Sequence, residues 1–286
     1  QKNQANIPPQ MMNPLEFLGA IFDTLFFKPI ITVLVLVINY LQDLGVAGAL
    51  GWAIVVLTLV VRFIVWPFIT AQIRSAKKMA DLRPLIEELK LKHKENRQDL
   101  LKAQTALYKE HGVSPAGGCL PALIQFPVFI ALANAIPLLF YPEGLTRINE
   151  LVFIKGVALT SQPDAHFLGF NLADQVSNKP LFSPEWTTLM LVPLITMGLS
   201  FIQSKMMFPP GLPKKESKGK EGTEDMMASM QSQMLYMMPL MIGVFSYNFP
   251  VGVALYWNIF TIVGIIQQYL VSGWGGMESW VKLVRR

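Results

Sequence analysis

The run of residues 46–70 restricts this chain more than any other feature of its sequence. It is apolar along most of its length and contains one charged residue, Arg62. A helix needs about 20 such residues to cross a bilayer, so the run predicts a membrane span. An arginine near the centre of a span costs roughly 2.5–3.5 kcal/mol on insertion scales. We therefore expect the protein to hold Arg62 in a polar, hydrated place within the membrane.

The composition extends this interpretation to the whole chain. Of the 286 residues, 52% are hydrophobic and 15% are charged, whereas a soluble domain has about 25% charged residues. The apolar residues fall in blocks of membrane-spanning length, which indicates an integral membrane protein. The single cysteine, Cys119, excludes an internal disulfide. The net charge of +5 does not indicate nucleic-acid binding as a primary role, because in a membrane protein the location of Lys and Arg matters more than their sum.

We predict an all-α integral membrane protein with five transmembrane helices around a hydrophilic groove. An N-terminal interfacial helix and a cytoplasmic helical hairpin complete the fold. The predicted segments are a flexible lead with the interfacial amphipathic helix (1–45), a first span (46–70), the cytoplasmic hairpin (71–117), a second span (118–140), an external loop (141–185), a third span (186–208), a cytoplasmic loop (209–232), a fourth span (233–248), a fifth span (250–272) and a cytoplasmic tail (273–286).

The stretch before the first span has two interpretations. Within residues 15–27 the apolar side chains recur at helical spacing, with Glu16 and Asp23 on the other face. This pattern is typical of a helix in the membrane interface. The apolar part that follows, residues 30–41, is short for a span. We interpret it as a continuation of the interfacial helix, and a true span over 30–44 is the alternative.

The basic residues predict the orientation. The hairpin, the 205–232 loop and the tail contain eighteen Lys and Arg, against five in the lead, the interfacial stretch and the external loop. Cytoplasmic loops carry an excess of Lys and Arg. We therefore expect the N-terminus outside, and the hairpin and the C-terminus in the cytoplasm.

The predicted spans lack the groups that most intramembrane chemistry needs. No span contains Asp or Glu, and His93, His111 and His166 all lie outside the spans. Intramembrane proteolysis requires an activated nucleophile or paired carboxylates, and zinc chemistry requires His, Cys or acidic ligands. We therefore expect no enzymatic activity, no metal and no cofactor.

Away from their ends, the spans contain one cation, Arg62, among neutral polar groups. Thr58 lies one helical turn before Arg62, on the same face. If the other polar faces converge on it, they form a hydrated cavity. The other polar residues that we single out in the spans are Gln125, Asn134, Ser200, Gln203, Asn258, Thr261, Gln267 and Gln268. The alternatives are that Gln and Asn join helices by hydrogen bonds and that Arg62 snorkels to the interface.

A cavity of this kind suits an acidic guest. Arg stays protonated and presents five donors in a fixed fork, and a low dielectric strengthens its attraction for a carboxylate. An inside-negative potential favours outward movement of anionic groups by about 2.3 kcal/mol per charge per 100 mV. The apolar part of the guest can then partition into lipid.

Three separated motifs resemble one family. VRFIVWP at 61–67, GGCLPALIQFP at 117–127 and FPVGVALYW at 249–257 occur in the order found in the YidC-type membrane insertases, the family shared with the Oxa and Alb proteins. The resemblance covers residues 15–272, nearly the whole chain. It implies a five-helix core with a hydrophilic groove that is open to cytoplasm and lipid. The large periplasmic domain of Gram-negative members has no counterpart in these residues.

The resemblance also implies residue roles and partners. Arg62 resembles the groove arginine, Thr58 its neighbour, and Tyr256 with Trp257 the aromatic pair that contacts the inserting segment. It implies insertion and folding of small or Sec-delivered membrane proteins, with nascent membrane proteins, the Sec translocon and the ribosome as partners in the lipid bilayer. The location that the resemblance implies is a bacterial plasma membrane, and the thylakoid membrane is our second choice. The competing hypothesis is a small-anion channel or transporter with Arg62 as its selectivity charge, although no inverted repeat is visible.

Overall fold

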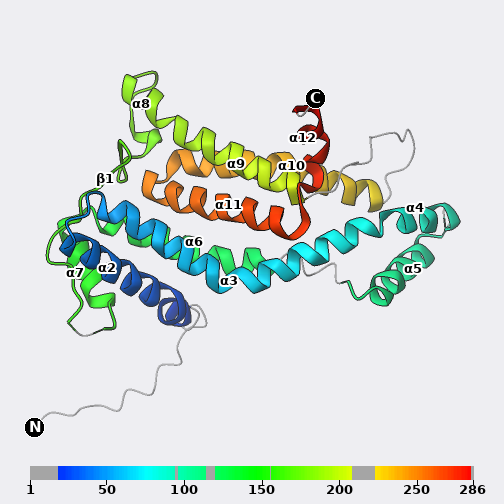
Figure 1. The fold of residues 1–286 in the computed structure, drawn as a ribbon, viewed down its shortest axis with the longest axis horizontal. Helices are drawn as coiled ribbons and strands as arrows, with labels where there is room; N and C mark the ends of the chain where they lie inside the picture. Colours follow the sequence, from blue (N-terminus) through cyan, green and yellow to red (C-terminus); the bar gives the residue numbers. More distant parts are fainter. Residues whose placement is uncertain (1–18, 94–95, 114–119, 155, 208–222, 285–286) are drawn as a thin grey trace, which may run out of the picture.

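The computed structural model describes residues 19–93, 96–113, 120–154, 156–207 and 223–284 (Figure 1). Helices dominate these residues, and the only strands among them are two residues long. The elements in chain order are η1 (Asp23–Phe27), α2 (Lys28–Asp43), α3 (Ala49–Asp81), α4 (Arg83–Lys92), α5 (Arg97–Glu110), α6 (Leu120–Leu138), α7 (Pro142–Leu151), β1 (His166–Phe167), β2 (Phe170–Asn171), η3 (Val176–Asn178), α8 (Pro184–Leu189), α9 (Leu191–Met207), α10 (Thr223–Asn248), α11 (Val251–Ser272), η4 (Gly275–Met277) and α12 (Glu278–Val284).

In the part of the chain that the structure describes, four helical stretches are long and apolar enough to cross a membrane, which agrees with an all-α integral membrane protein. They are Gly19–Asp43, Ala49–Asp81, Pro184–Met207 and Val251–Ser272. Among the described residues, α6 contributes only a shorter apolar helix, Gln125–Leu138. The predicted spans 118–140 and 233–248 are thus not among these four, and the count of five spans stays a prediction.

The first of these stretches joins the two parts that the sequence analysis treats as an interfacial helix. Residues 19–43 form one continuous helix, with a π-helical turn, η1, just before Pro29. Proline lacks a backbone N–H and its ring crowds the carbonyl four residues before it, and the wider π register relieves this conflict. On α2, Ile31, Leu34 and Ile38 are buried in the core. Its location in the interface stays a prediction.

The core lies where α3 meets its neighbours. The helix α11 packs against both α3 and α9, α10 packs against α9, and α2 packs against α3 (Figure 1). Leu50, Ile54 and Leu57 of α3 are buried in one apolar cluster with Leu132 and Ile136 of α6. This packing holds one face of α3 against α11, and that face carries the candidate site.

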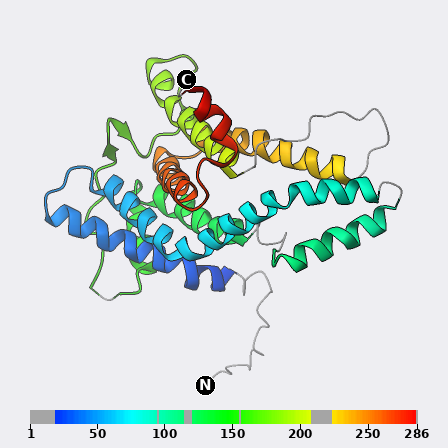
Figure 2. The ribbon, with the colours of Figure 1, turned by 45° about the vertical axis from the view of Figure 1, so that its right-hand side comes forward.

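The charged segment after the first predicted span begins as part of the same helix. Residues 71–81 continue α3 without a break, so the predicted hairpin starts inside this helix. The helix ends before Pro84, and α4 and α5 pack together as an outlying pair (Figure 2). Asn96 caps α5, because its Oδ1 accepts hydrogen bonds from the backbone N–H groups of Gln98 (3.1 Å) and Asp99 (3.3 Å).

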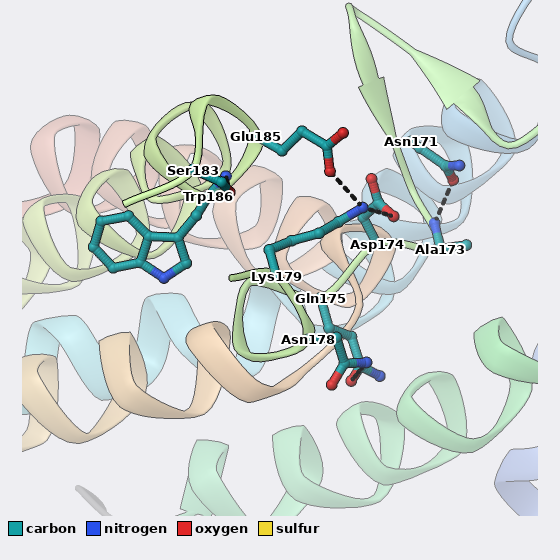
Figure 3. A network of polar contacts seen from close by, with 9 residues as sticks. All are labelled: Asn171, Ala173, Asp174, Gln175, Asn178, Lys179, Ser183, Glu185 and Trp186. Carbon is teal, nitrogen blue, oxygen red and sulfur yellow. Dashed lines mark hydrogen bonds and ion pairs between the residues drawn. The ribbon is translucent and has the colours of Figure 1, made fainter. Parts of the chain in front are cut away.

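The predicted external loop is ordered around the start of α11. The backbone carbonyl oxygens of Leu172 and Asp174 each accept a hydrogen bond, at 2.9 Å, from Gly252 and Val251 at the first turn of this helix. Lys179 Nζ lies 3.2 Å from both Asp174 Oδ1 and Glu185 Oε2 (Figure 3). The hydrogen bond to Glu185 and then the one to Asp174 raise the pKa of the Lys179 ammonium group. This network links the loop to the start of α8.

Candidate functional site

Arg62 lies on the face of α3 that packs against α11, and only 2% of its surface is exposed. Its Cζ is 4.2 Å from the centre of the Phe260 ring on α11. This distance is within the range of a cation–π interaction, which stabilises a desolvated cation by about 2 kcal/mol. Arg62 therefore packs between helices and does not extend along the helix surface toward an interface.

A glycine on α11 makes room for the guanidinium. A methyl group added at Gly264 would overlap both Arg62 Nη2 and Gln203 Nε2. Gln203 comes from α9, so three helices meet at the absent side chain of Gly264. The structure thus brings together Arg62 and Gln203, two of the predicted groove residues.

The charge of Arg62 has no opposite charge beside it. Among the described residues, no carboxylate forms an ion pair with Arg62, and its Nε is buried without a hydrogen-bond partner. A buried donor without a partner costs about 1–3 kcal/mol, and more when it is charged. Structural arginines in protein interiors are normally paired. This arrangement is therefore that of a residue kept for a purpose other than stability.

Other predicted polar residues also have buried side-chain atoms that form no described hydrogen bond. Ser200 Oγ and Asn258 Oδ1 have no hydrogen-bond partner among the described residues. Ser200 is one turn before Gln203 on α9 and so lies on the same face. Thr58 is fully buried one turn before Arg62, but its hydroxyl donates to the carbonyl oxygen of Ile54 at 2.6 Å. Thr58 therefore fills space beside the site with its hydrogen bond already made.

The aromatic residues Tyr256 and Trp257 face different neighbours. Tyr256 is fully buried, and its hydroxyl accepts a hydrogen bond of 2.6 Å from Gln125 Nε2 on α6. Its ring lies 6.0 Å from that of Phe260, which contacts Arg62. Trp257 instead packs edge-to-face on Phe129 of α6, at 5.1 Å. Only the first member of the predicted aromatic pair connects to the arginine.

Trp257 borders a small apolar pocket that α6, α9, α10 and α11 share. The hydroxyl oxygens of Thr196 and Ser246 lie 3.3 Å apart within its lining, and Phe245 and Phe249 line it as well. None of the residues that line this pocket is Arg62 or a neighbour of Arg62 described above. The pocket is therefore separate from the arginine site.

Gln267 and Asn134 do not join the cluster at Arg62. Gln267 Nε2 donates to the carbonyl oxygen of Trp66 and to Thr70 Oγ1, both at 2.9 Å, so it ties α11 to a later turn of α3. Asn134 is exposed on α6 and donates to the carbonyl oxygen of Ile130 in its own helix. The sequence does not show which side of α6 faces α3, which explains why Asn134 was grouped with the others.

Two residues at the centre of the site were not among the predicted site residues, namely Phe260 and Gly264. They follow Tyr256 at intervals of four along α11, which places all three on one helix face. This spacing is the sequence signal that indicates both residues. An aromatic pair and a glycine on one helix face leave room for a large side chain from the opposite helix.

The Gln125–Tyr256 hydrogen bond leads to a testable prediction about stability. Tyr256→Phe removes the hydroxyl and leaves the Gln125 amide without this partner, which costs about 1–3 kcal/mol. We expect the midpoint of thermal unfolding in detergent to fall by several degrees. Tyr269→Phe, at an exposed position on the same helix, is the matched control and should leave the midpoint unchanged. Equal midpoints for both variants would contradict a structural role of this bond.

Known proteins are similar to this chain over most of its length. Residues 40–276 match the family described as 60Kd inner membrane protein. A protein named Membrane protein insertase YidC from Oceanobacillus iheyensis is 30% identical over 88% of this chain and 84% of its own length. One of the same name from Fusobacterium nucleatum is 30% identical over 78% of this chain and 86% of its length. A third, from Syntrophobacter fumaroxidans, is 30% identical over 87% of this chain, which spans only 38% of that relative.

Proposed function

This chain belongs to the 60Kd inner membrane protein family, because residues 40–276 match the pattern of that family. We propose that it is a membrane protein insertase and chaperone. The observation that carries the proposal is the Arg62 side chain, buried on a helix of membrane-spanning length with no described carboxylate to pair with it. Relatives that carry the insertase name support the same activity.

In this proposal, a client provides the missing negative charge. The guanidinium presents donors in a planar fork that matches a carboxylate. An Asp or Glu in the translocated tail of a client pairs with Arg62, and Gln203 Nε2 adds a neutral donor beside it. The neutral amide assists binding without competing for the charge. The pair forms in a low-dielectric site, where the attraction exceeds that in water.

The site must open before a client can enter it. The guanidinium is covered by Phe260 on one side and adjoins Gln203 on another. The predicted hydrophilic groove, open to cytoplasm and lipid, therefore corresponds to a second arrangement in which α9 separates from α3 and α11. Release of the client returns Arg62 to the face of Phe260, so each carboxylate is held only transiently.

The apolar part of the client follows a different surface. On α9, Leu191, Leu194 and Ile195 are exposed, and α10 adds Leu240 and Val244. These side chains present an apolar surface beside the predicted groove, along which an apolar segment can pass into lipid. From the family we also propose a bacterial plasma membrane location with the N-terminus outside, and the Sec translocon and the ribosome as partners.

Reconstitution tests the activity directly. The whole chain is placed in liposomes with a single-span client whose short translocated tail carries two acidic residues, and protection of the tail from added protease is measured. We expect protection several-fold above that in protein-free liposomes. The small-anion channel alternative predicts chloride flux without a client. Flux without any gain in protection would overturn the insertase proposal.

A further inference from the structure

A second polar site lies on the other side of α6, away from Arg62. An open pocket of about 250 Å³ forms where η1, α6 and α7 meet, and its lining combines apolar and charged side chains. The lining residues are Phe22, Asp23, Phe27, Asn134, Leu138 and Arg147. By the predicted orientation this is the external end of α6, since the loop that follows is external.

The two charges of this pocket do not neutralise each other. Asp23 comes from the π-helical turn η1 and Arg147 from α7, and both line the pocket, but they form no ion pair. Neither side chain forms a hydrogen bond or ion pair with any other described residue. Asn134 uses one amide N–H within its helix and keeps the other and its carbonyl oxygen. The pocket therefore offers an anion site and a cation site side by side.

An apolar strip leads away from the pocket along α6. Phe126 and Ile130 are 56% and 45% exposed, and with Asn134 they recur every four residues on one helix face. The distance along the helix from Asn134 to Phe126 is about 12 Å at 1.5 Å per residue. The face thus has a polar end at the pocket and an apolar end toward the interior of the predicted span, which is the polarity of a lipid molecule.

We propose that this pocket binds the headgroup of a phospholipid that carries both a phosphate and a primary ammonium group, as phosphatidylethanolamine does. Arg147 and the Asn134 amide bind the phosphate, Asp23 binds the ammonium group, and an acyl chain lies over Ile130 and Phe126. Phosphatidylglycerol lacks the ammonium group and brings its phosphate near Asp23 without compensation. Phosphatidylcholine has no N–H to donate to Asp23.

Native mass spectrometry of the whole chain, released from nanodiscs with equal parts of the three lipids, tests the proposal. We expect retained phosphatidylethanolamine to exceed each other lipid about tenfold, a difference of about 1.4 kcal/mol. Asp23→Asn should abolish the preference for phosphatidylethanolamine over phosphatidylglycerol. Arg147→Gln should lower the retention of both of these lipids. Arg74→Gln, an exposed arginine on α3, is the matched control and should change nothing. Equal retention of the three lipids, or unaltered retention in both pocket variants, would overturn the proposal.

A soluble headgroup separates a lipid site from a site for any small zwitterion. Glycerophosphoethanolamine carries the same phosphate and ammonium groups without acyl chains. We expect it not to displace the bound lipid at a hundredfold excess, because the apolar strip contributes to binding. Complete displacement would show that the strip is not part of the site. Since Asp23 and Arg147 are exposed, the variants should fold normally, and unchanged unfolding midpoints verify this.

Discussion

Arg62→Ala is expected to lower insertion of a client with an acidic translocated tail at least tenfold, about 1.4 kcal/mol in the binding free energy of that tail. The variant removes the only charge of the span and leaves the client carboxylate without its partner in a low-dielectric site. Arg62→Lys should give an intermediate rate, because an ammonium group keeps the charge but loses the planar fork. Protease protection of the client tail in proteoliposomes measures both effects.

The thermal stability of these variants should not fall in parallel with their insertion activity. Removal of the buried Arg62 guanidinium relieves a charge without a described carboxylate partner but also ends its contact with Phe260, so the two effects oppose each other and the thermal midpoint should change little. Arg74→Ala, an exposed position on the same helix, should change neither quantity. A client whose acidic residues are replaced by Asn should insert equally well with wild type and Arg62→Ala. Normal insertion of the acidic client by well-expressed Arg62→Ala would contradict the charge mechanism.

The sequence was most informative where one local pattern decides the structure. The apolar run around Arg62 predicts a helix, and the structure has a helix over Ala49–Asp81. Within the predicted hairpin the structure has two helices, α4, which ends at Lys92, and α5, which begins at Arg97. Hydrophobic period and turn residues act over a few positions, so a single chain is enough to see them.

The limits of α3 were harder to see, for a physical reason. The change from apolar to charged residues near Thr70 predicts where the chain leaves the membrane for water. It does not predict a change of backbone conformation. Gln72, Lys77 and Lys78 form helices readily, so the helix continues into the charged part. Likewise, Pro29 lies within a continuous helix, because the π-helical turn before it accommodates the proline ring.

Which residues form the site depends on how the helices pack together, and a single sequence does not show this packing. Their polar residue types identified Arg62, Ser200 and Gln203 as candidates. The type of a residue does not show toward which neighbouring helix its side chain points. Asn134 proved to face the second pocket. In the structure Phe260 packs over the guanidinium, so the open groove stays a prediction.

Gly264→Ala is expected to reduce insertion of the acidic client about tenfold while the protein still folds. The new methyl group overlaps Arg62 Nη2 and Gln203 Nε2, which are the flexible ends of long side chains, so they move in preference to the backbone. The guanidinium then leaves the place between Phe260 and Gln203. Misplacing a binding group by about 1 Å is enough for losses of this size or larger. Client protection in proteoliposomes and the thermal midpoint measure the two quantities.

A second helical glycine provides the control for this prediction. Nothing lies within 4 Å of a methyl group added at Gly198 on α9, so Gly198→Ala should insert clients normally. Both replacements raise helix propensity by up to about 1 kcal/mol, so propensity cancels in the comparison. Gly264→Ala should also spare a client without acidic residues, because displacement of Arg62 removes only the charge-dependent step. Equal insertion of the acidic client by the two variants would mean that the position of the guanidinium, as opposed to its presence, does not limit the reaction.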